Sequence, residues 1–495
     1  METTDVVIIG AGVLGCAVAR ELSRYRLSVT VLERAHDVGE GSSKANSGVL
    51  HAGFHPRGGS LKGRSCVEGN ALMRTLVREL QVPFVESGGL MVAFHDDGVE
   101  KLRKKASQGR QNGVTDLSLV DGDAARVLEP RLSSKVIAAL VAPTTAVVTP
   151  FHLVLAMAQN AAVNGVRFRF SAQVERVEGN ADTGLGSALL PAGHRYLLHL
   201  TDGSRLAARF VANMAGDDAQ RLDSLVHPAD YEIQPRLGEF LVFDKQDPAD
   251  AVTHVIYQAE ETDEGGTLLA PTVEGNLLAG PTARNVSGFD VTASSADGLE
   301  HVRRVALKLI PDLDVSTVIA NFAGVRANIT NVAKEQKDFV VRASAEGFVS
   351  ALGIKNPGLT ASPALALLAI DELRKQGLRL ELDPAFDPVR PAHVPFLKRP
   401  AADQERLLQE DPTHGHVICR CEGVTEGDVR AVLRESLPPH TIDGVKKRLR
   451  TGMGRCQGAF CTPRLVATMA ALLDVPETAI VSGERGGHYV TRMAK

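Results

Sequence analysis

The N-terminal stretch of the chain combines apolar runs with glycines at a spacing that constrains the fold more than any other part of the sequence. An apolar run at residues 6–9 leads into Gly-Ala-Gly-Val-Leu-Gly at residues 10–15, and a second apolar run at residues 28–32 ends on Glu33. Strand, glycine-rich turn, helix, second strand and terminal acid follow one another in this order. The pattern predicts a βαβ unit that binds a dinucleotide.

Each glycine of this turn has its own task in such a unit. Gly10 permits the tight turn after the strand, Gly12 lets the backbone approach a pyrophosphate, and Gly15 lets the helix pack against the sheet. The phosphates then lie at the N-terminus of the helix, where backbone amides favour an anion. We expect Glu33 to hold ribose hydroxyls, with Arg34 beside it in the cofactor site.

A second intact fingerprint is not found in the rest of the sequence. This counts against a reductase that uses both FAD and NAD. An enzyme with one tightly held flavin takes its electrons directly from an organic substrate and passes them to oxygen, a quinone or another protein.

Four of the six cysteines lie close together near the C-terminus: Cys419, Cys421, Cys456 and Cys461. Two disulfides would suit a secreted chain, but the chain begins with acidic residues and a strand rather than a signal peptide, so a reducing compartment is expected. Four thiolates can hold zinc or an iron–sulfur cluster. The C-x-C pair followed far downstream by a glycine-rich C-x4-C favours two bridged irons over zinc, whose sites usually present C-x2-C to C-x4-C knuckles.

Length and charge indicate a modular enzyme. The 495 residues suffice for about three domains, and the formal net charge of −4 gives no reason to expect a nucleic-acid partner. No apolar stretch is long enough for a transmembrane segment. We therefore expect a cytoplasmic protein that reaches a membrane only peripherally, through a partner. The basic runs 101–105 and 446–450 are predicted to be solvated helix faces; alternatively, the second offsets the charge of a thiolate-bound cluster or docks an acidic partner.

The order of strand-like segments predicts an α/β protein with a Rossmann-like FAD-binding domain, an inserted antiparallel-sheet substrate domain and a small C-terminal iron–sulfur domain. A proline-rich stretch with little periodicity separates the last of these from the rest. The expected boundaries are 1–80, 145–230 and 325–378 for the FAD-binding domain, 81–144 and 231–324 for the substrate domain, 379–414 for a linker, 415–475 for the [2Fe-2S] domain and 476–495 for a tail.

A loop of small residues, 41–53, follows the second strand almost at once. Its small side chains let the backbone lie against a flat ligand, although an ordinary polar loop has the same composition. With a flavin fold before it, we expect the loop to lie under the isoalloxazine, with His51 beside the reactive ring. Four of its residues are expected to bind the cofactor: Ser42, Ser43, Asn46 and Ser47.

These motifs resemble the FAD-dependent oxidoreductases of the D-amino-acid-oxidase superfamily, and within it the branch of glycerol-3-phosphate and L-2-hydroxyglutarate dehydrogenases. The resemblance runs through residues 1 to about 375. It is carried by the fingerprint and by the segments 43–53, 235–240, 269–276, 280–282, 322–326 and 353–361. The region from Gly452 to Cys461 is similar to the [2Fe-2S] domain of bacterioferritin-associated ferredoxin. That ferredoxin has a C-x2-C second pair, so the C-x4-C here points to the version that ends the catalytic subunit of anaerobic glycerol-3-phosphate dehydrogenase.

Oxidation of a secondary alcohol by hydride transfer requires a group that removes the hydroxyl proton, and a histidine suits that task. His51 is the candidate base and His55 the competitor; the resemblance favours His51. The resemblance also places Arg326 near the flavin, where it would fix an anionic substrate, although a structural ion pair is the alternative. Lys355 is either a second cation of the site or a cap on a helix that starts near Ser362.

The remaining cofactor residues follow from the same resemblance. Gly358, Leu359 and Thr360 would bring backbone amides to the pyrimidine edge of the flavin. Val174, Gly216 and Gly353 complete the expected cofactor-binding set.

The resemblance predicts an FAD-dependent dehydrogenase that oxidises glycerol 3-phosphate to dihydroxyacetone phosphate and passes electrons through a [2Fe-2S] cluster to an acceptor protein or a quinone-linked subunit. L-2-hydroxyglutarate is the alternative substrate, because a phosphate and a distal carboxylate are both small anions. A flavin and iron–sulfur relay subunit without catalysis of its own is a further alternative.

Overall fold

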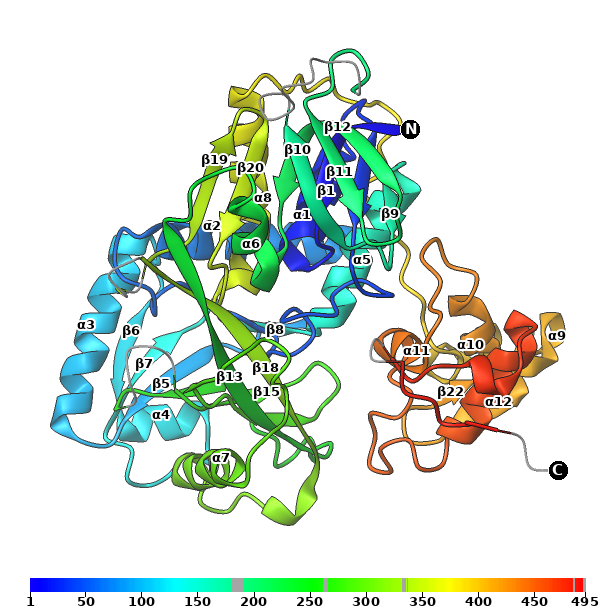
Figure 1. Cartoon of the computed structure of the whole chain (residues 1–495). Coiled ribbons are helices and arrows are strands. Elements are labelled where there is room, and N and C mark those ends of the chain that lie inside the picture. Colours follow the sequence, from blue (N-terminus) through cyan, green and yellow to red (C-terminus); the bar gives the residue numbers. More distant parts are fainter. Residues whose placement is uncertain (180–189, 261–265, 332–334, 336, 484–485, 493–495) are drawn as a thin grey trace.

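Two large β-sheets and a smaller C-terminal unit of short helices make up the molecule (Figure 1). The structure is a computed structural model, and it describes residues 1–179, 190–260, 266–331, 335, 337–483 and 486–492. The α-helices are α1 (Val13–Leu22), α2 (Leu61–Glu79), α3 (Asp96–Asn112), α4 (Gly122–Leu128), α5 (Pro150–Val163), α6 (Ala219–Asp223), α7 (Ala296–Leu309), α8 (Gly358–Lys375), α9 (Ala401–Glu410), α10 (Glu426–Val432), α11 (Ile442–Leu449) and α12 (Thr462–Leu473).

The first sheet contains eight strands within the described residues. Its spatial order is β10 (Val174–Gly179), β11 (Tyr196–Leu200), β12 (Arg205–Asn213), β1 (Glu2–Ile9), β2 (Val29–Leu32) and β9 (Arg167–Arg169), with β20 (Phe348–Leu352) beside β12 and β19 (Val340–Ala345) beside β20. The strands β20, β12, β1, β2 and β9 run parallel, and the outer pairings are antiparallel. This is the open sheet that the Rossmann-like prediction requires, with β1 at its centre.

Helices cover one face of this sheet. α1 packs against α5 and α8, and α8 packs against α2. The interface is a dry core in which Val18, Leu153 and Leu365 are fully buried. The carboxyl ends of the parallel strands lie at the first turn of α1, so this packing fixes the position of the glycine-rich turn.

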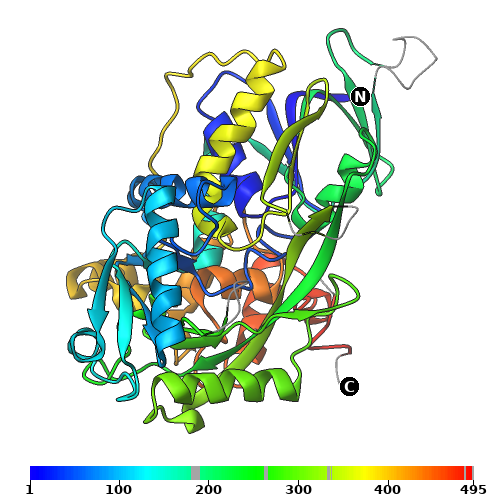
Figure 2. The ribbon, with the colours of Figure 1, turned by 90° about the vertical axis from the view of Figure 1, so that its left-hand side faces the viewer.

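The second sheet contains nine strands within the described residues. Its order is β17 (Arg284–Asn285), β13 (Tyr231–Phe243), β16 (Leu277–Gly280), β15 (Leu268–Pro271), β14 (Val255–Gln258), β5 (Gly89–Ala93), β7 (Ala138–Ala142) and β6 (Ser118–Asp121), and β18 (Val318–Asn331) pairs with β13. Most pairings are antiparallel, as expected, whereas β14 and β5 are parallel. Figure 2 shows α7 along one end of this sheet and α3 upright beside it.

The long strand β18 passes through residue 325, where the sequence placed a boundary between two domains. It pairs with β13 along its whole length, from Tyr231 opposite Asn331 to Phe243 opposite Val318. The nine-stranded sheet therefore extends to residue 331. A pattern of local hydrophobicity does not reveal this, because the pairing partner lies far away in the sequence.

A three-stranded sheet joins the two halves of the structure. It contains β3 (Val49–Leu50), β8 (Ala146–Val148) and β4 (Phe84–Val85). Residues 84–93 thus contribute to two sheets, since β4 belongs here and β5 belongs to the nine-stranded sheet.

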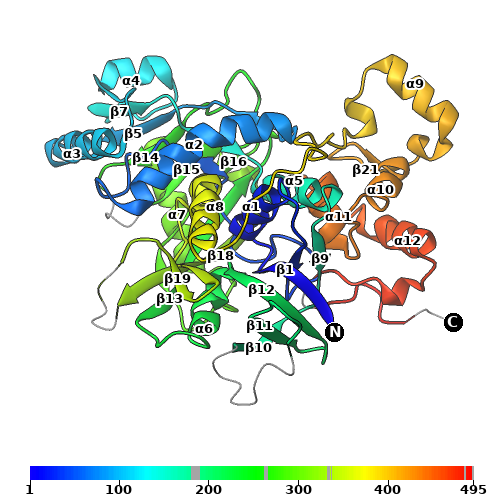
Figure 3. The same cartoon turned by 90° about the horizontal axis from the view of Figure 1, so that it is seen from above.

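The C-terminal unit lies to one side of both sheets (Figure 3). It holds α10, α11, α12 and a small sheet of β21 (Val417–Cys419) and β22 (Val424–Thr425). The stretch expected to be a linker contains α9, and part of it lies against the end of α2: the Arg390 amide donates to the Glu79 carbonyl at 3.0 Å. None of the helices in the described part of the chain combines the length and the apolar character that crossing a bilayer demands.

Candidate active site and cysteine centre

The glycine-rich turn has no room for side chains. A Cβ on Gly10, whose φ is +97°, would lie 2.8 Å from the Met214 carbonyl oxygen, and a Cβ on Gly15 would lie 1.9 Å from the Gly10 carbonyl oxygen. At Gly12 a Cβ would approach the Ser43 hydroxyl to 3.2 Å. The glycines thus let this turn pack closely, as the turn that holds the pyrophosphate of a dinucleotide does.

Glu33 is buried at the end of β2 and holds the turn in place. One carboxylate oxygen accepts the Ala11 amide at 2.7 Å and the other accepts the Ala35 amide at 2.9 Å. Each oxygen has a second lone pair, so the carboxylate can also accept ribose hydroxyls. The arrangement is compatible with the role predicted for Glu33.

The other residues expected around the dinucleotide lie on or just after strands of the eight-stranded sheet. Arg34 forms an ion pair with Asp217 at 2.9 Å, and Asp217 directly follows Gly216, whose φ is +62°. Val174 is buried at the start of β10, and its carbonyl accepts from Arg221 at 2.9 Å. The side chain of Arg34 is thus engaged by a carboxylate within the protein.

The loop after β2 connects the N-terminus of α1 to the nine-stranded sheet. The Ser43 hydroxyl accepts the Val13 amide at 2.9 Å, and the Ser42 hydroxyl donates to the Val325 carbonyl at 2.5 Å. The Asn46 side chain donates to the Ser43 carbonyl at 2.9 Å. The first two bonds tie the loop to α1 and β18, and the third folds it on itself, so that its backbone and Ser47 line a cavity beside the nine-stranded sheet.

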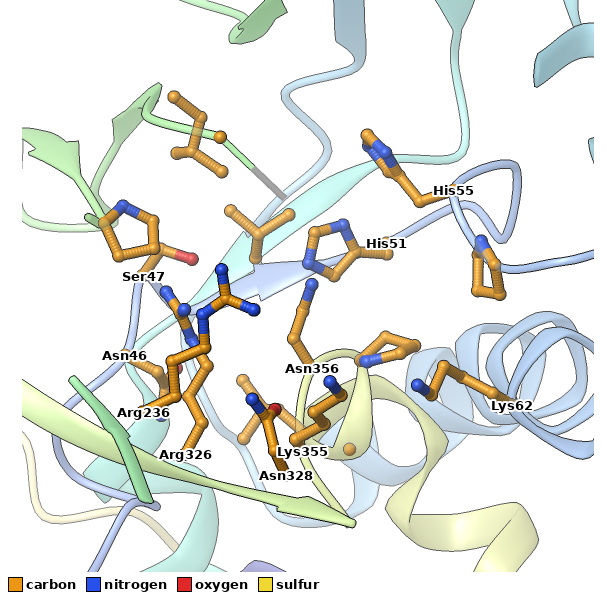
Figure 4. A pocket seen from close by; sticks show the side chains of 18 of the residues that line it. Asn46, Ser47, His51, His55, Lys62, Arg236, Arg326, Asn328, Lys355 and Asn356 are labelled. Atoms are coloured by element: carbon orange, nitrogen blue, oxygen red, sulfur yellow. The ribbon is translucent and has the colours of Figure 1, made fainter. Parts of the chain in front are cut away.

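The cavity has a volume of about 800 Å³. Polar side chains reach it from the nine-stranded sheet, from α2 and from the loop before α8 (Figure 4). They include His51, His55, Lys62, Arg236, Tyr257, Arg326, Lys355 and Asn356. A cavity of this size with convergent polar groups is typical of a small-molecule site.

His51 is buried in the wall of this cavity and its backbone is held from both directions. Its amide donates to the Thr360 hydroxyl at 3.0 Å, and its carbonyl accepts from the Asn70 side chain at 3.1 Å. The Tyr257 hydroxyl lies 3.4 Å from Nδ1 of the ring. Burial lowers the pKa of His51 to about 4, and a hydrogen bond with the Asn356 side chain offsets part of this shift. The imidazole is therefore neutral at physiological pH and can accept a proton.

His55 also lines the cavity, but its surroundings are less suitable for a base. Its ring packs on Phe54 with centroids 4.2 Å apart and lies edge-on to His51 at 5.7 Å. Burial lowers its pKa well below the ordinary value, and the charges of His51 and Lys105 lower it further.

Several cations line the same cavity, and among them Lys355 is close enough to Lys62, Arg236 and Arg326 to feel their charges. Arg236 and Arg326 come from the adjacent strands β13 and β18, and Nη2 of Arg326 donates to the Thr282 carbonyl at 3.1 Å. Burial lowers the pKa of Arg326 to about 10, with a further contribution from Arg236. Burial lowers the pKa of Lys355 to about 7, followed by the charges of Lys62, Arg236 and Arg326. Such a concentration of positive charge favours an anionic ligand.

The helix α8 starts at Gly358, four residues before the predicted start near Ser362. Its N-cap is Pro357, without a side-chain hydrogen bond, so Lys355 does not cap the helix and instead lines the cavity. Gly358 and Leu359 also line the cavity, and the Thr360 hydroxyl donates to the Val49 carbonyl at 3.4 Å. The positive end of the helix dipole thus faces the ligand space, as an anionic edge of a flavin requires.

Gly353 allows the loop before α8 to turn. Its φ is +67°, and a Cβ there would lie 2.3 Å from the Ile329 side chain on β18. The loop is thereby packed against the strand that carries Arg326.

The four C-terminal cysteines lie in two pairs in the small unit. The sulfurs of Cys421 and Cys456 are 3.7 Å apart, and Cys419 shares a hydrogen bond with Cys461. All four are free thiols. A Cβ on Gly454 would lie 2.3 Å from the Cβ of Cys421, so glycine is needed at that position of the second cysteine loop. Two pairs of thiols on facing loops fit two irons that each need two protein ligands.

Comparison with known families matches the two parts of the chain separately. The family model for FAD dependent oxidoreductases matches residues 5–372, and that for BFD-like [2Fe-2S] binding domains matches residues 417–471. The chain belongs to the FAD dependent oxidoreductase family. This flavoprotein accordingly has FAD and a [2Fe-2S] cluster as its cofactors.

Similar proteins extend this assignment. The flavoprotein is 36% identical to the glycerol 3-phosphate dehydrogenase of Caloramator mitchellensis over 99% of both chains. It is 26% identical to one subunit of the anaerobic glycerol-3-phosphate dehydrogenase of Escherichia coli K12, over 94% of this chain and 87% of that protein. Among solved structures, the FAD-bound, dithionite-reduced L-alpha-glycerophosphate oxidase from Mycoplasma pneumoniae has a TM-score of 0.71 at 27% identity and covers 79% of this chain and 99% of its own.

The basic run 446–450 of the flavoprotein is not the solvated helix face that the sequence predicted. Lys447 and Arg448 are buried, and they pair with Glu40 and Asp37 in the loop after β2. The Arg448–Asp37 distance is 2.7 Å. The run does dock onto acidic residues, but they belong to the FAD-binding half of the same chain. In the other run, Lys105 is also buried and donates to the His55 carbonyl at 3.0 Å.

Sequence reasoning gave no role to several side chains of the cavity: Lys62, Arg236, Tyr257 and Asn356. Arg236 lies within a segment that carried the family resemblance, and Asn356 follows Lys355 directly. Tyr257 and Lys62 come from β14 and α2, and no local pattern distinguishes them from ordinary surface or core residues.

Proposed function

We propose that this flavoprotein oxidises sn-glycerol 3-phosphate to dihydroxyacetone phosphate. The observation that carries the proposal is the group of cations around Arg326 and Lys355 in one cavity, beside a buried, neutral histidine. A small phosphate ester with a secondary alcohol suits both features, since the cations bind the phosphate and the histidine faces the alcohol. The full-length likeness to a glycerol 3-phosphate dehydrogenase supports the same substrate.

His51 acts as the general base in this proposal. FAD, when bound, supplies the hydride acceptor. The imidazole takes the proton of the substrate hydroxyl as the carbon–oxygen bond gains double-bond character. Thr360 and Asn70 hold the backbone of His51 and Tyr257 contacts its ring, so that little reorganisation accompanies proton transfer. A bound phosphate dianion raises the pKa of His51 from its low starting value, because a negative charge stabilises the imidazolium.

Arg326 and Arg236 bind the phosphate in this proposal, and Lys355 and Lys62 add charge from the other side of the cavity. Guanidinium groups suit a phosphate because they donate two parallel hydrogen bonds. A charged anchor at one end of the substrate also fixes the distance between its alcohol and His51.

The residues that would hold FAD are those of the glycine-rich turn, Glu33, the loop 42–47 and the first turn of α8. The cysteines Cys419, Cys421, Cys456 and Cys461 would hold the [2Fe-2S] cluster. Electrons then leave the protein through the cluster to an acceptor protein or a quinone-linked subunit. The Escherichia coli relative supports this step, because its name describes it as one subunit of a dehydrogenase. Any membrane association would depend on that partner.

Anaerobic mixing of the purified holoprotein with either glycerol 3-phosphate or L-2-hydroxyglutarate tests the substrate. We expect rapid loss of the flavin absorbance with glycerol 3-phosphate alone. Loss of the flavin absorbance with L-2-hydroxyglutarate alone would identify that acid as the substrate, with His51 as the base and the same cations as its anion site. Loss with neither, in protein that dithionite reduces normally, would favour an electron relay over an enzyme.

A further inference from the structure

The four cysteines differ in their access to solvent. Cys419 and Cys461 are buried, whereas Cys421 is exposed and Cys456 partly exposed. A cluster held by these residues therefore has one buried side and one side that faces solvent at Cys421 and Cys456. Electron transfer to another protein requires close approach, so the exposed side is where a partner must dock.

An exposed aromatic ring lies between two arginines next to these cysteines. Phe460 is 43% exposed, and the guanidinium carbons of Arg420 and Arg464 each lie 4.7 Å from its ring centroid. Arg420 directly precedes Cys421, and Phe460 directly precedes Cys461. Arg464 is fixed on α12 by a bond to the Val417 carbonyl at 3.1 Å. We call Arg420, Phe460 and Arg464 the exit patch.

The exit patch keeps its positive charge. Among the described residues, no carboxylate pairs with Arg420 or Arg464. The acid closest in sequence, Glu422, is buried and already bound by Arg450 at 3.1 Å and Lys245 at 3.3 Å. A large apolar group at the centre, with arginines around it, is the composition of a protein–protein hot spot.

We propose that the exit patch is the docking surface for an acidic protein that accepts one electron at a time. This inference rests on the proposed function, because it takes the cysteines as cluster ligands. Oxidation of one alcohol to a ketone releases two electrons and two protons. The cluster carries one electron at a time, so two acceptor proteins are each reduced by one electron and the protons go to solvent. A membrane surface fits less well, since basic segments that bind anionic lipid carry clusters of roughly four to eight cations.

The test uses the full-length holoprotein with cytochrome b5, a small acidic one-electron haem protein, as the probe. Reduction of the flavoprotein with dithionite before mixing makes the measurement independent of the substrate. The variants are Arg420→Glu and Arg464→Glu, and Arg303→Glu on the remote helix α7 is the matched control. A neutral short-chain quinone serves as an acceptor that needs no docking surface.

We expect each exit-patch variant to reduce cytochrome b5 roughly tenfold more slowly at low ionic strength, with the difference shrinking as salt is added. Titration calorimetry with the oxidised proteins should show a matching loss of affinity. Rates with the quinone, iron content and the Arg303→Glu rates should stay at the wild-type level. If a charge-reversal variant has a lower iron content, Arg420→Gln and Arg464→Gln are used instead. They should slow cytochrome b5 reduction by a smaller factor.

Three outcomes would overturn the proposal. Unchanged transfer to cytochrome b5 would remove the docking role. An equal loss with cytochrome b5 and the quinone would mean that the arginines tune the cluster instead. Loss of binding to phosphatidylserine vesicles, with cytochrome b5 unaffected, would assign the patch to a membrane. Failure of glycerol 3-phosphate to reduce the flavin would refute the proposed substrate and leave this test intact.

Discussion

Arg236 on β13 lies directly opposite Arg326 on β18, so that two guanidinium groups are cross-strand neighbours beside one cavity. Like charges in such positions destabilise a sheet. The repulsion contributes to the lowered pKa of Arg326. A bound dianion removes it, so the unfavourable pairing in the free protein becomes a favourable interaction in the complex.

Replacement of either arginine by methionine is therefore expected to weaken substrate binding. Loss of one charged hydrogen-bonding partner corresponds to about 1.5–3 kcal/mol, which is roughly a 10- to 100-fold increase in KM. Steady-state kinetics with glycerol 3-phosphate would measure it. Arg284→Met on the neighbouring strand β17 is the control, because its side chain is exposed and does not line the cavity. An unchanged KM in Arg326→Met would remove this residue from the phosphate site.

Gly238 sets the position of the Arg326 side chain. A Cβ at Gly238 would lie 2.7 Å from Nη2 of Arg326 and 2.8 Å from Pro281. The Gly238→Ala variant should displace the guanidinium and raise KM about tenfold, while the flavin spectrum stays that of the wild type. Gly275→Ala provides a contrast, since at a φ of +88° it strains an exposed turn but has nothing within 4 Å of its added methyl group, so it destabilises without displacing a side chain. An equal effect of both variants would indicate general destabilisation rather than displacement of Arg326.

His51→Asn should slow substrate-dependent reduction of the flavin by roughly 10²- to 10⁴-fold, the usual contribution of a general base. His55→Asn should retain most of the rate, because His55 packs against Phe54 at the edge of the same cavity. Anaerobic rapid mixing measures both rates. Dithionite reduction of each variant shows whether its flavin is intact. A larger loss in His55→Asn than in His51→Asn would exchange their roles.

Lys355 should make substrate binding depend on pH. With a pKa lowered to about 7 by burial and by the neighbouring cations, its amine is protonated below pH 7 and loses its charge as the pH rises. The substrate phosphate is already a dianion in that range, so KM should increase by up to about tenfold per pH unit above 7. Lys355→Arg should abolish this increase because arginine keeps its charge. The same slope in both proteins would point to another titrating group.

The ion pair between Arg448 and Asp37 should be essential for docking of the C-terminal unit onto the loop after β2. Leaving a buried charge without any partner costs about 3–5 kcal/mol, and loss of Arg448 should cost less because Lys447, at 3.3 Å, still pairs with Asp37. Arg448→Met is therefore expected to lower the thermal unfolding temperature, and Lys446→Met, at a partly exposed position of the same helix, should change it little. Adding Asp37→Asn to Arg448→Met should recover part of the loss. No recovery would mean that the two charges act independently.

The features that could be predicted from the sequence are those that neighbouring residues determine together. The glycine-rich turn, Glu33 and the loop with His51 each follow from spacing within a few dozen residues. The pairing of Arg236 with Arg326 depends instead on the register of two strands about 90 residues apart, and register is a property of the folded sheet. Pro363 favours a helix that starts near Ser362, because proline suits the first helical turn. In the structure α8 starts earlier, and Pro363 occupies its sixth position.

The basic run near the C-terminus shows the same limit from another side. Charges in succession predict a solvated face, and only the folded chain reveals that Lys447 and Arg448 meet Glu40 and Asp37 about 400 residues away. Local sequence contains the charges but not their partners. The two pairs of cysteines were easier to predict, since thiol chemistry restricts what four such residues can do.

The order of strands in the first sheet has a consequence for synthesis on the ribosome. β1 emerges first, but one of its two neighbours, β12, lies about 200 residues later, and β20 follows only near residue 350. At about 5–20 residues per second, the apolar strand that begins the dinucleotide site waits on the order of 10 to 40 seconds for that neighbour. During this interval the apolar strand lacks one of its partners, and the cavity is complete only after most of the polypeptide has been made, because Gly358 and Leu359 line it.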